Sequence, residues 1–174
     1  MTFRITRFIE IDAGHRIMTH GSKCRHIHGH RYRIEAECEA PDVQPSGEQT
    51  GMVLDFGFLK EEMLAIIDQP CDHGFLASVD DRELLSMFAP DSGDLTLWLA
   101  KLQADVAAHG FARPDHTRLE TKLYVVPFQP TAECLARHWY SLLQTPVHTR
   151  SGGIATLTKV RVWETPNCVG EFGH

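Results

Sequence analysis

The stretch from residue 28 to residue 39 alternates between apolar and charged side chains, and this pattern constrains the fold more than any other feature. Strict alternation is typical of a β-strand with one face against a core and the other toward solvent. The stretch therefore predicts a sheet with one covered face. Its apolar positions are Tyr32, Ile34, Ala36 and Cys38, and its charged positions are Arg31, Arg33, Glu35, Glu37 and Glu39.

The rest of the chain predicts a mixed order of strands and helices. Asp55 and Thr131 are good helix N-caps, and Pro70 and Gly110 are stop signals. Two antiparallel strands, then helices, then antiparallel strands predict an α+β fold, and 174 residues suit a single domain over 1–174. The predicted strands are 2–13, 28–39, 119–126, 154–164 and 168–172, and the predicted helices run from 55 to 70, over 94–109 and from 131 onward.

Composition excludes several classes of protein. A formal net charge of −6 argues against general nucleic-acid binding, which needs a basic surface. An anionic small molecule stays compatible, because Lys23, Arg25 and Arg31 supply a locally basic mouth. No apolar run approaches the ~20 residues that span a bilayer, and the N-terminus lacks a signal-peptide core. Five irregularly spaced cysteines predict no disulfide framework, so we expect a cytoplasmic protein without membrane partners.

Three histidines are predicted to share the covered face of the sheet. His28 and His30 lie two residues apart and have the parity of the apolar positions that follow them. His15 has the parity of Ile9 and Ile11 in the first strand. Neutral imidazoles are natural Zn²⁺ ligands, and three protein ligands leave a fourth position open, as in catalytic sites. The alternative is a set of hydrogen-bonded core histidines, and the third histidine favours the metal.

Cys24 lies in the loop between these histidines and admits three interpretations. As a fourth ligand it would close a structural zinc site. As a free thiol beside the cations Lys23 and Arg25, it would favour the reactive thiolate form. It could also be an inert loop thiol, and spacing alone leaves all three open.

Six segments along the chain resemble the 6-pyruvoyl-tetrahydropterin synthase / 6-carboxytetrahydropterin synthase family. They are His15, Cys24-x3-His28-Gly-His30, GMVLDF (51–56), CDHGFL (71–76), PTAE (130–133) and VRVWET (160–165). The resemblance implies the tunnelling fold, a ββααββ antiparallel sheet with helices on one face. Copies of that unit usually assemble into a barrel, so a homo-oligomer (trimer or hexamer) is expected. The segment 78–127, with its own helix and strand, is interpreted as an insertion into that unit.

The resemblance also implies roles for individual residues. It assigns zinc to His15, His28 and His30, proton abstraction to Cys24, a proton relay to Asp72 and His73, pterin anchoring to Glu164, and pocket closure to Thr131 and Glu133.

Some of these roles have independent support, and others have plain structural alternatives. Glu164 shares the parity of Val160 and Val162, so its carboxylate points toward the apolar face, where a charge needs a partner. The alternative places Glu164 at the solvent edge of its strand. Asp72 with His73 could simply flank a turn. Thr131 and Glu133 would also serve as a helix N-cap and an acidic first turn.

The resemblance implies a zinc-dependent lyase without a redox cofactor. The substrate would be 7,8-dihydroneopterin triphosphate, and the products 6-carboxytetrahydropterin, acetaldehyde and triphosphate, on the route to 7-deazaguanine (queuosine) precursors. The alternative within the family is 6-pyruvoyl-tetrahydropterin synthase, which releases triphosphate only. Rivals from other classes are a non-catalytic structural zinc protein and a zinc hydrolase that activates water.

Overall fold

The computed structural model describes all 174 residues, and their contacts cluster into two compact units. Two long strands, β1 (Phe3–His15) and β2 (His28–Ala40), take part in both units. That the two units form one domain over residues 1–174 stays a prediction. Unit 1 comprises Met1–Glu10, Tyr32–Gln69 and Ala132–His174, and unit 2 comprises Ile11–Arg31 and Pro70–Thr131.

Unit 1 contains an antiparallel set of strands built on the alternating stretch. β2 pairs antiparallel with β5 (Thr156–Thr165), which pairs antiparallel with β6 (Cys168–Gly173). The apolar positions of β2 are buried and its charged positions lie at or near the surface, which confirms the parity that the sequence predicts. Ion pairs such as that of Arg161 with Glu37, at 3.1 Å, line the polar face.

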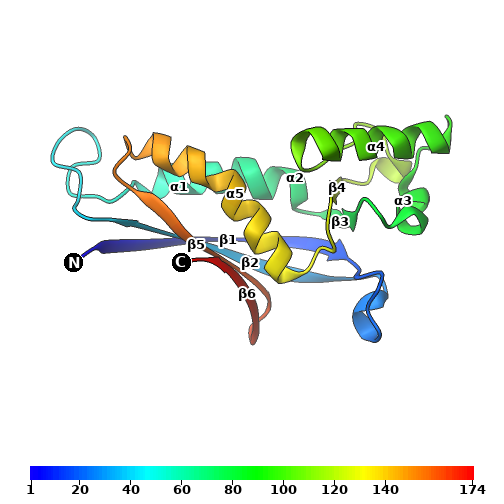
Figure 1. Ribbon diagram of the computed structural model, residues 1–174, viewed down its shortest axis with the longest axis horizontal. Coiled ribbons are helices and arrows are strands. Elements are labelled where there is room, and N and C mark those ends of the chain that lie inside the picture. Colours follow the sequence, from blue (N-terminus) through cyan, green and yellow to red (C-terminus); the bar gives the residue numbers. More distant parts are fainter. The chain divides into compact units, whose positions relative to one another are not determined.

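Two helical segments belong to unit 1, and both lie over the same side of its strands (Figure 1). α1 (Phe56–Met63) begins at the predicted N-cap Asp55, whose carboxylate accepts backbone N–H groups at 2.6 and 3.2 Å. α5 (Ala132–Arg150) packs along β5 and β6. The core between them is apolar, and includes Leu59, Met63, Ile67, Leu135, Trp139, Leu143, Val160 and Val162.

The predicted end of the first helix at Pro70 is wrong by one residue. A π-helical turn (Leu64–Asp68) follows α1, and α2 (Gln69–Cys71) continues through the proline. Proline lacks an N–H and its ring normally clashes with the carbonyl four residues earlier. The wider π turn just before Pro70 relieves that clash, which lets the helix continue.

Unit 2 contains parallel strand pairings that the sequence does not reveal. The end of β1 pairs in parallel with β3 (Gly74–Ser78), placing His15 beside Leu76, and β3 pairs in parallel with β4 (Leu123–Val126). The sheet as a whole follows the order β4-β3-β1-β2-β5-β6. The α+β class is confirmed, and the sheet departs from the expected antiparallel order at these two pairings. Parallel strands are buried on both faces, so β3 and β4 lack the alternation that marks a strand in sequence.

The segment between β3 and β4 forms two helices over these strands. α3 (Arg82–Phe88) was not predicted, whereas α4 (Leu95–His109) matches the predicted helix, with Asp94 as N-cap and Gly110 in the left-handed conformation at φ 80°. None of the helices is both long and apolar enough to cross a membrane. The core of this unit is Phe75, Ala77, Leu84, Leu85, Leu99, Leu102, Val106, Ala112, Leu123 and Val125.

We expect Gly170→Ala to destabilise unit 1, because β6 passes close to the start of α5 at this residue. An added Cβ would lie 2.7 Å from the backbone nitrogen of Glu133 and 2.8 Å from the carbonyl carbon of Ala132. Overpacking of this kind costs about 1–3 kcal/mol of unfolding free energy, which urea denaturation measures. Gly21→Ala is the matched control, since nothing lies within 4 Å of its Cβ. Equal stability of the two variants would contradict the packing described.

Candidate functional site

Three histidine rings meet where β1 ends and β2 begins. The ring centroids of His15, His28 and His30 lie 4.5, 5.1 and 5.0 Å apart in pairs. One ligand atom from each ring lies within 4.8 Å of the others. His15 is buried, at 2% exposure, and the other two are half-buried. The structure thus brings together the three residues that strand parity predicts to share one face, and all three belong to unit 2.

Backbone carbonyls determine which nitrogen of two rings carries the proton. His15 Nδ1 lies 2.8 Å from Pro130 O, and His28 Nδ1 lies 2.7 Å from His26 O. A carbonyl oxygen can only accept, so each Nδ1 must be the donor. In the neutral rings, the two Nε2 atoms are therefore unprotonated, with their lone pairs available.

These two Nε2 atoms lie only 3.1 Å apart. Two lone pairs cannot form a hydrogen bond with each other, so this approach calls for a cation between them. Zinc binds imidazole nitrogen at about 2.0–2.1 Å in a tetrahedron, which sets its ligand nitrogens about 3.3–3.4 Å apart. The observed spacing is close to that value, and the donor set suits Zn²⁺.

Burial favours the neutral, metal-binding form of His15 and His30. Desolvation lowers the pKa of His15 to about 4; the hydrogen bond to Pro130 acts in the opposite direction, and the neighbouring histidines add a smaller lowering. Desolvation also lowers the pKa of His30, as does the nearby His28 ring. Histidine binds metal only when neutral, so at neutral pH no proton has to leave His15 before an ion can bind.

Cys24 lies in a single 3₁₀ turn (Lys23–Arg25) and is half-buried. Its carbonyl accepts the N–H of Ile17 at 2.8 Å, which ties together the two sides of the loop between β1 and β2. The group of possible ligands with atoms within 4.8 Å of one another consists of the three histidines, and Cys24 is not part of it. This geometry favours a three-histidine site with an open position over a closed site with a fourth sulfur ligand.

Asp72 and His73 form a hydrogen-bonded pair beside β1. His73 Nδ1 donates to Asp72 Oδ2 at 2.7 Å, and Asp72 Oδ1 accepts the N–H of Asp12 at 2.8 Å. Burial raises the pKa of the Asp72 carboxyl, but the Asp12 N–H and His73 outweigh it and leave the pKa below its ordinary value. His73 has φ 55°, a conformation that non-glycine residues rarely adopt and that gathers at functional sites.

A surface hollow of about 430 Å³ connects the Asp72–His73 pair to the histidine cluster, since His30 and His73 both line it. Arg31 and Asp12 form a two-point ion pair across it, at 3.0 and 2.9 Å. Asp12 was not singled out from the sequence, because the residues it pairs with, Arg31 and Asp72, lie far from it in the chain. The wall consists of Asp12, Ala13, Gly14, Gly29, His30, Arg31, His73 and Gly74.

The remaining predicted site residues divide between the units. Glu164 and Glu133 belong to unit 1, and Thr131 to unit 2. Glu164 is half-buried in β5, at a register irregularity between Trp163 and Thr165. Glu133 is exposed in the first turn of α5, directly after the half-buried Thr131 and the buried Ala132. Their functional roles stay predictions.

Solved structures share this fold over the whole chain. An uncharacterized protein of Wolinella succinogenes superposes with a TM-score of 0.73 at 20% identity, covering 100% of this chain and 99% of its own. A catalytic-residue mutant of the Plasmodium vivax 6-pyruvoyltetrahydropterin synthase superposes with a TM-score of 0.63 at 15% identity, covering 100% and 98%. These likenesses confirm the tunnelling fold that the sequence motifs imply.

Sequence comparison identifies the family. The 6-carboxy-5,6,7,8-tetrahydropterin synthase of Rickettsia conorii is 30% identical over 168 residues, 97% of this chain and 98% of that protein. Most of segment 78–127 therefore lies within the alignment with this relative. The profile of the 6-pyruvoyl tetrahydropterin synthase family matches residues 4–174. The chain belongs to the 6-pyruvoyl tetrahydropterin synthase family.

Proposed function

We propose that the chain is a zinc-dependent 6-carboxy-5,6,7,8-tetrahydropterin synthase. It would convert 7,8-dihydroneopterin triphosphate and water to 6-carboxytetrahydropterin, acetaldehyde and triphosphate, a step toward 7-deazaguanine precursors. The observation that carries the proposal is the pair of unprotonated Nε2 atoms, of His15 and His28, facing each other at 3.1 Å. The name of the full-length Rickettsia conorii relative supports the carboxy product.

In this proposal His15, His28 and His30 hold one zinc ion and leave a position open for substrate. A bound zinc would supply Lewis acidity there, to polarise hydroxyl oxygens of the substrate side chain. The half-buried thiol of Cys24 removes a proton from that side chain. No redox cofactor is needed, because the ring is reduced as the side chain is oxidised.

Asp72 and His73 have the arrangement of an orienting carboxylate and a proton carrier. Because Nδ1 of His73 donates to Asp72, its neutral ring presents an unprotonated Nε2 that can take up and return a proton. The lowered pKa of Asp72 keeps it ionised, so its charge stabilises the imidazolium that forms. The exposed ring, at 78%, is accessible to a substrate.

The pterin itself is assigned to Glu164. A carboxylate accepts two parallel N–H donors, which matches the amino group and ring N–H of a pterin. Thr131 and Glu133 would close the pocket, and a trimer or hexamer would be the working assembly.

Turnover of 7,8-dihydroneopterin triphosphate tests the reaction class most directly. We expect mass analysis of the product mixture to find 6-carboxytetrahydropterin and acetaldehyde. A pyruvoyl side chain retained on the pterin would identify a 6-pyruvoyl-tetrahydropterin synthase instead. An unchanged substrate, under conditions in which the protein carries zinc, would sink the proposal.

Substitution of a proposed ligand should remove the metal. We expect His28→Ala to weaken zinc binding more than about 100-fold, because it removes one of three nitrogen donors from a site with an open position. Competition with a chromophoric chelator measures the dissociation constant. His26→Ala is the matched control, since His26 acts on the cluster only through its backbone carbonyl. Equal affinity of the two variants would rule out His28 as a ligand.

Cys24→Ala separates catalysis from metal binding. We expect the variant to keep its zinc and lose about 10²–10⁴-fold in turnover, the usual contribution of general acid–base catalysis. Zinc content by elemental analysis and steady-state kinetics check both halves. Loss of zinc together with activity would instead indicate the structural four-ligand site, and unchanged turnover would assign the proton transfer to another group.

A further inference from the structure

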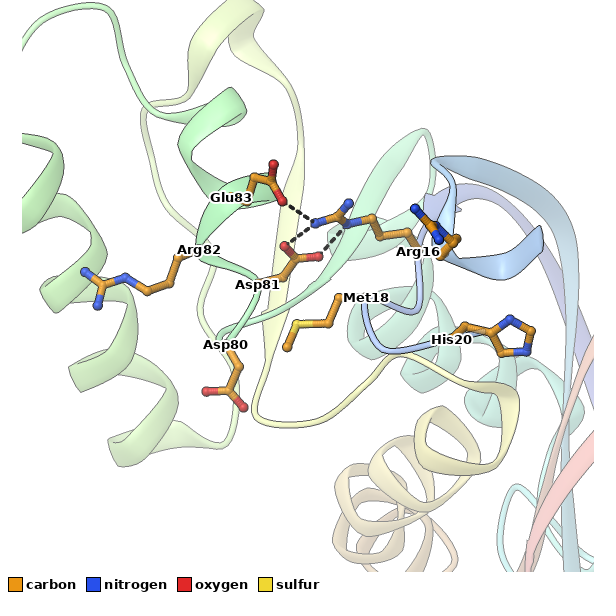
Figure 2. A pocket seen from close by; sticks show the side chains of 8 residues that line it. Arg16, Met18, His20, Asp80, Asp81, Arg82 and Glu83 are labelled. Carbon is orange, nitrogen blue, oxygen red and sulfur yellow. Dashed lines mark hydrogen bonds and ion pairs between the residues drawn. The ribbon is translucent and has the colours of Figure 1, made fainter. Parts of the chain in front are cut away.

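Arg16, the residue after the proposed ligand His15, forms a two-point ion pair with Asp81 (Figure 2). Its Nε lies 2.6 Å from Asp81 Oδ2 and its Nη2 lies 2.6 Å from Asp81 Oδ1. The Asp81 side chain is 4% exposed and that of Arg16 is 21% exposed. Surface ion pairs contribute little, but a short, two-point and largely buried pair restricts both partners strongly.

Asp81 is itself held firmly by the elements around it. Its carboxylate caps α3 by accepting the N–H of Leu84 at 3.1 Å, and its own N–H donates to Ser78 O at 3.1 Å. Ser78 is the last residue of β3, the strand that pairs with the end of β1. The ion pair thus ties the chain that leaves β1 to the chain that leaves β3.

The backbone around Arg16 connects to both His15 and Cys24. His15 precedes it, and the next residue, Ile17, donates its N–H to the carbonyl of Cys24 at 2.8 Å. Met18 then donates its N–H to Gln129 Oε1 at 3.0 Å. Arg16 is therefore the anchored residue between a ring of the histidine cluster and the backbone contact that holds Cys24.

Distance and burial distinguish Asp81 from the neighbouring acidic residue Glu83 as the anchor of Arg16. Glu83 also approaches Arg16, but at 3.6 Å and with 89% of its side chain exposed. In Figure 2, Arg82 points away from Arg16. A hollow of about 480 Å³ beside this pair is lined by Arg16, Met18, His20, Arg25, Asp80, Asp81, Arg82 and Glu83.

We propose that Arg16 and Asp81 are a positioning pair that holds the loop 16–24 so that His15 and Cys24 keep a set separation. The inference rests on the proposed function, since it assigns the loop a role only if His15 binds metal and Cys24 reacts. Neither Arg16 nor Asp81 touches substrate in this scheme. Each acts through the backbone of the loop.

The test compares two aspartates, Asp81 and Asp94, that each cap the N-terminus of a helix. Asp81→Asn keeps an oxygen that can cap α3, but its amide group cannot accept both guanidinium N–H groups. Asp94→Asn makes the same change at the N-cap of α4, where the carboxylate accepts only the N–H groups of Thr96 and Leu97, at 2.7 and 3.2 Å. Arg16→Lys keeps the charge and loses the two-point geometry, and so provides a second variant if Asp81→Asn fails to fold.

Three readouts do not depend on turnover: the zinc dissociation constant, the visible spectrum of the Co²⁺-substituted protein, and the alkylation rate of Cys24 mapped by mass spectrometry. We expect Asp81→Asn to weaken zinc binding by about 10-fold or more, as does loss of a residue that orients a metal ligand. The same variant should change the Co²⁺ spectrum and the alkylation rate of Cys24. Arg16→Lys should also weaken zinc binding and change the Co²⁺ spectrum and the alkylation rate of Cys24. Asp94→Asn and the exposed-partner variant Glu83→Gln should leave all three within about twofold of wild type, with melting temperature as the stability check.

Two results would overturn the inference alone. In the first, the wild-type protein binds zinc, and the zinc dissociation constants of Asp81→Asn and Arg16→Lys lie within twofold of the wild-type constant. The other is an equal loss of affinity in Asp81→Asn and Asp94→Asn, which would show a general stability effect. A wild-type chain that takes up no zinc would overturn both this inference and the proposed metal site.

Discussion

The structure around the candidate site depends on one close approach, that of the unprotonated Nε2 atoms of His15 and His28 at 3.1 Å. Each ring is held in that orientation by a carbonyl that accepts from its Nδ1, from Pro130 and from His26. A partly buried arrangement that points lone pairs at each other is unfavourable until a cation lies between them. The geometry of the cluster therefore favours a bound metal, independent of any resemblance to other proteins.

The protein positions these groups with ordinary elements. Strand parity brings His28 and His30 to one face of β2, and the parallel pairing of β1 with β3 places His15 beside Leu76. The same pairing brings Asp72 and His73 next to Asp12, where hydrogen bonds hold His73 at φ 55°. Cys24 lies on the loop that connects β1 and β2, the two strands that carry the three histidines.

The parts of the fold that depend on local periodicity could be predicted from the sequence. The alternation in β2 and the N-cap at Asp55 were recognisable because each is a local pattern. β3 was missed, because a strand buried on both faces does not alternate. Its first residues also belong to the segment CDHGFL (71–76), where only Asp72 and His73 were considered from the sequence. The parallel pairing of β4 with β3 was missed for the same lack of alternation. The Arg16–Asp81 pair joins residues 65 apart in the chain, and only the tertiary pairing of β1 with β3 brings them together.

X-ray absorption at the zinc K-edge of the purified protein tests the central claim most directly. The account predicts a first shell of three imidazole nitrogens at about 2.0–2.1 Å, completed by a light oxygen ligand and without sulfur. A zinc–sulfur distance of about 2.3 Å in the resting protein would contradict it, because Cys24 would then be a ligand rather than the free thiol that removes a proton.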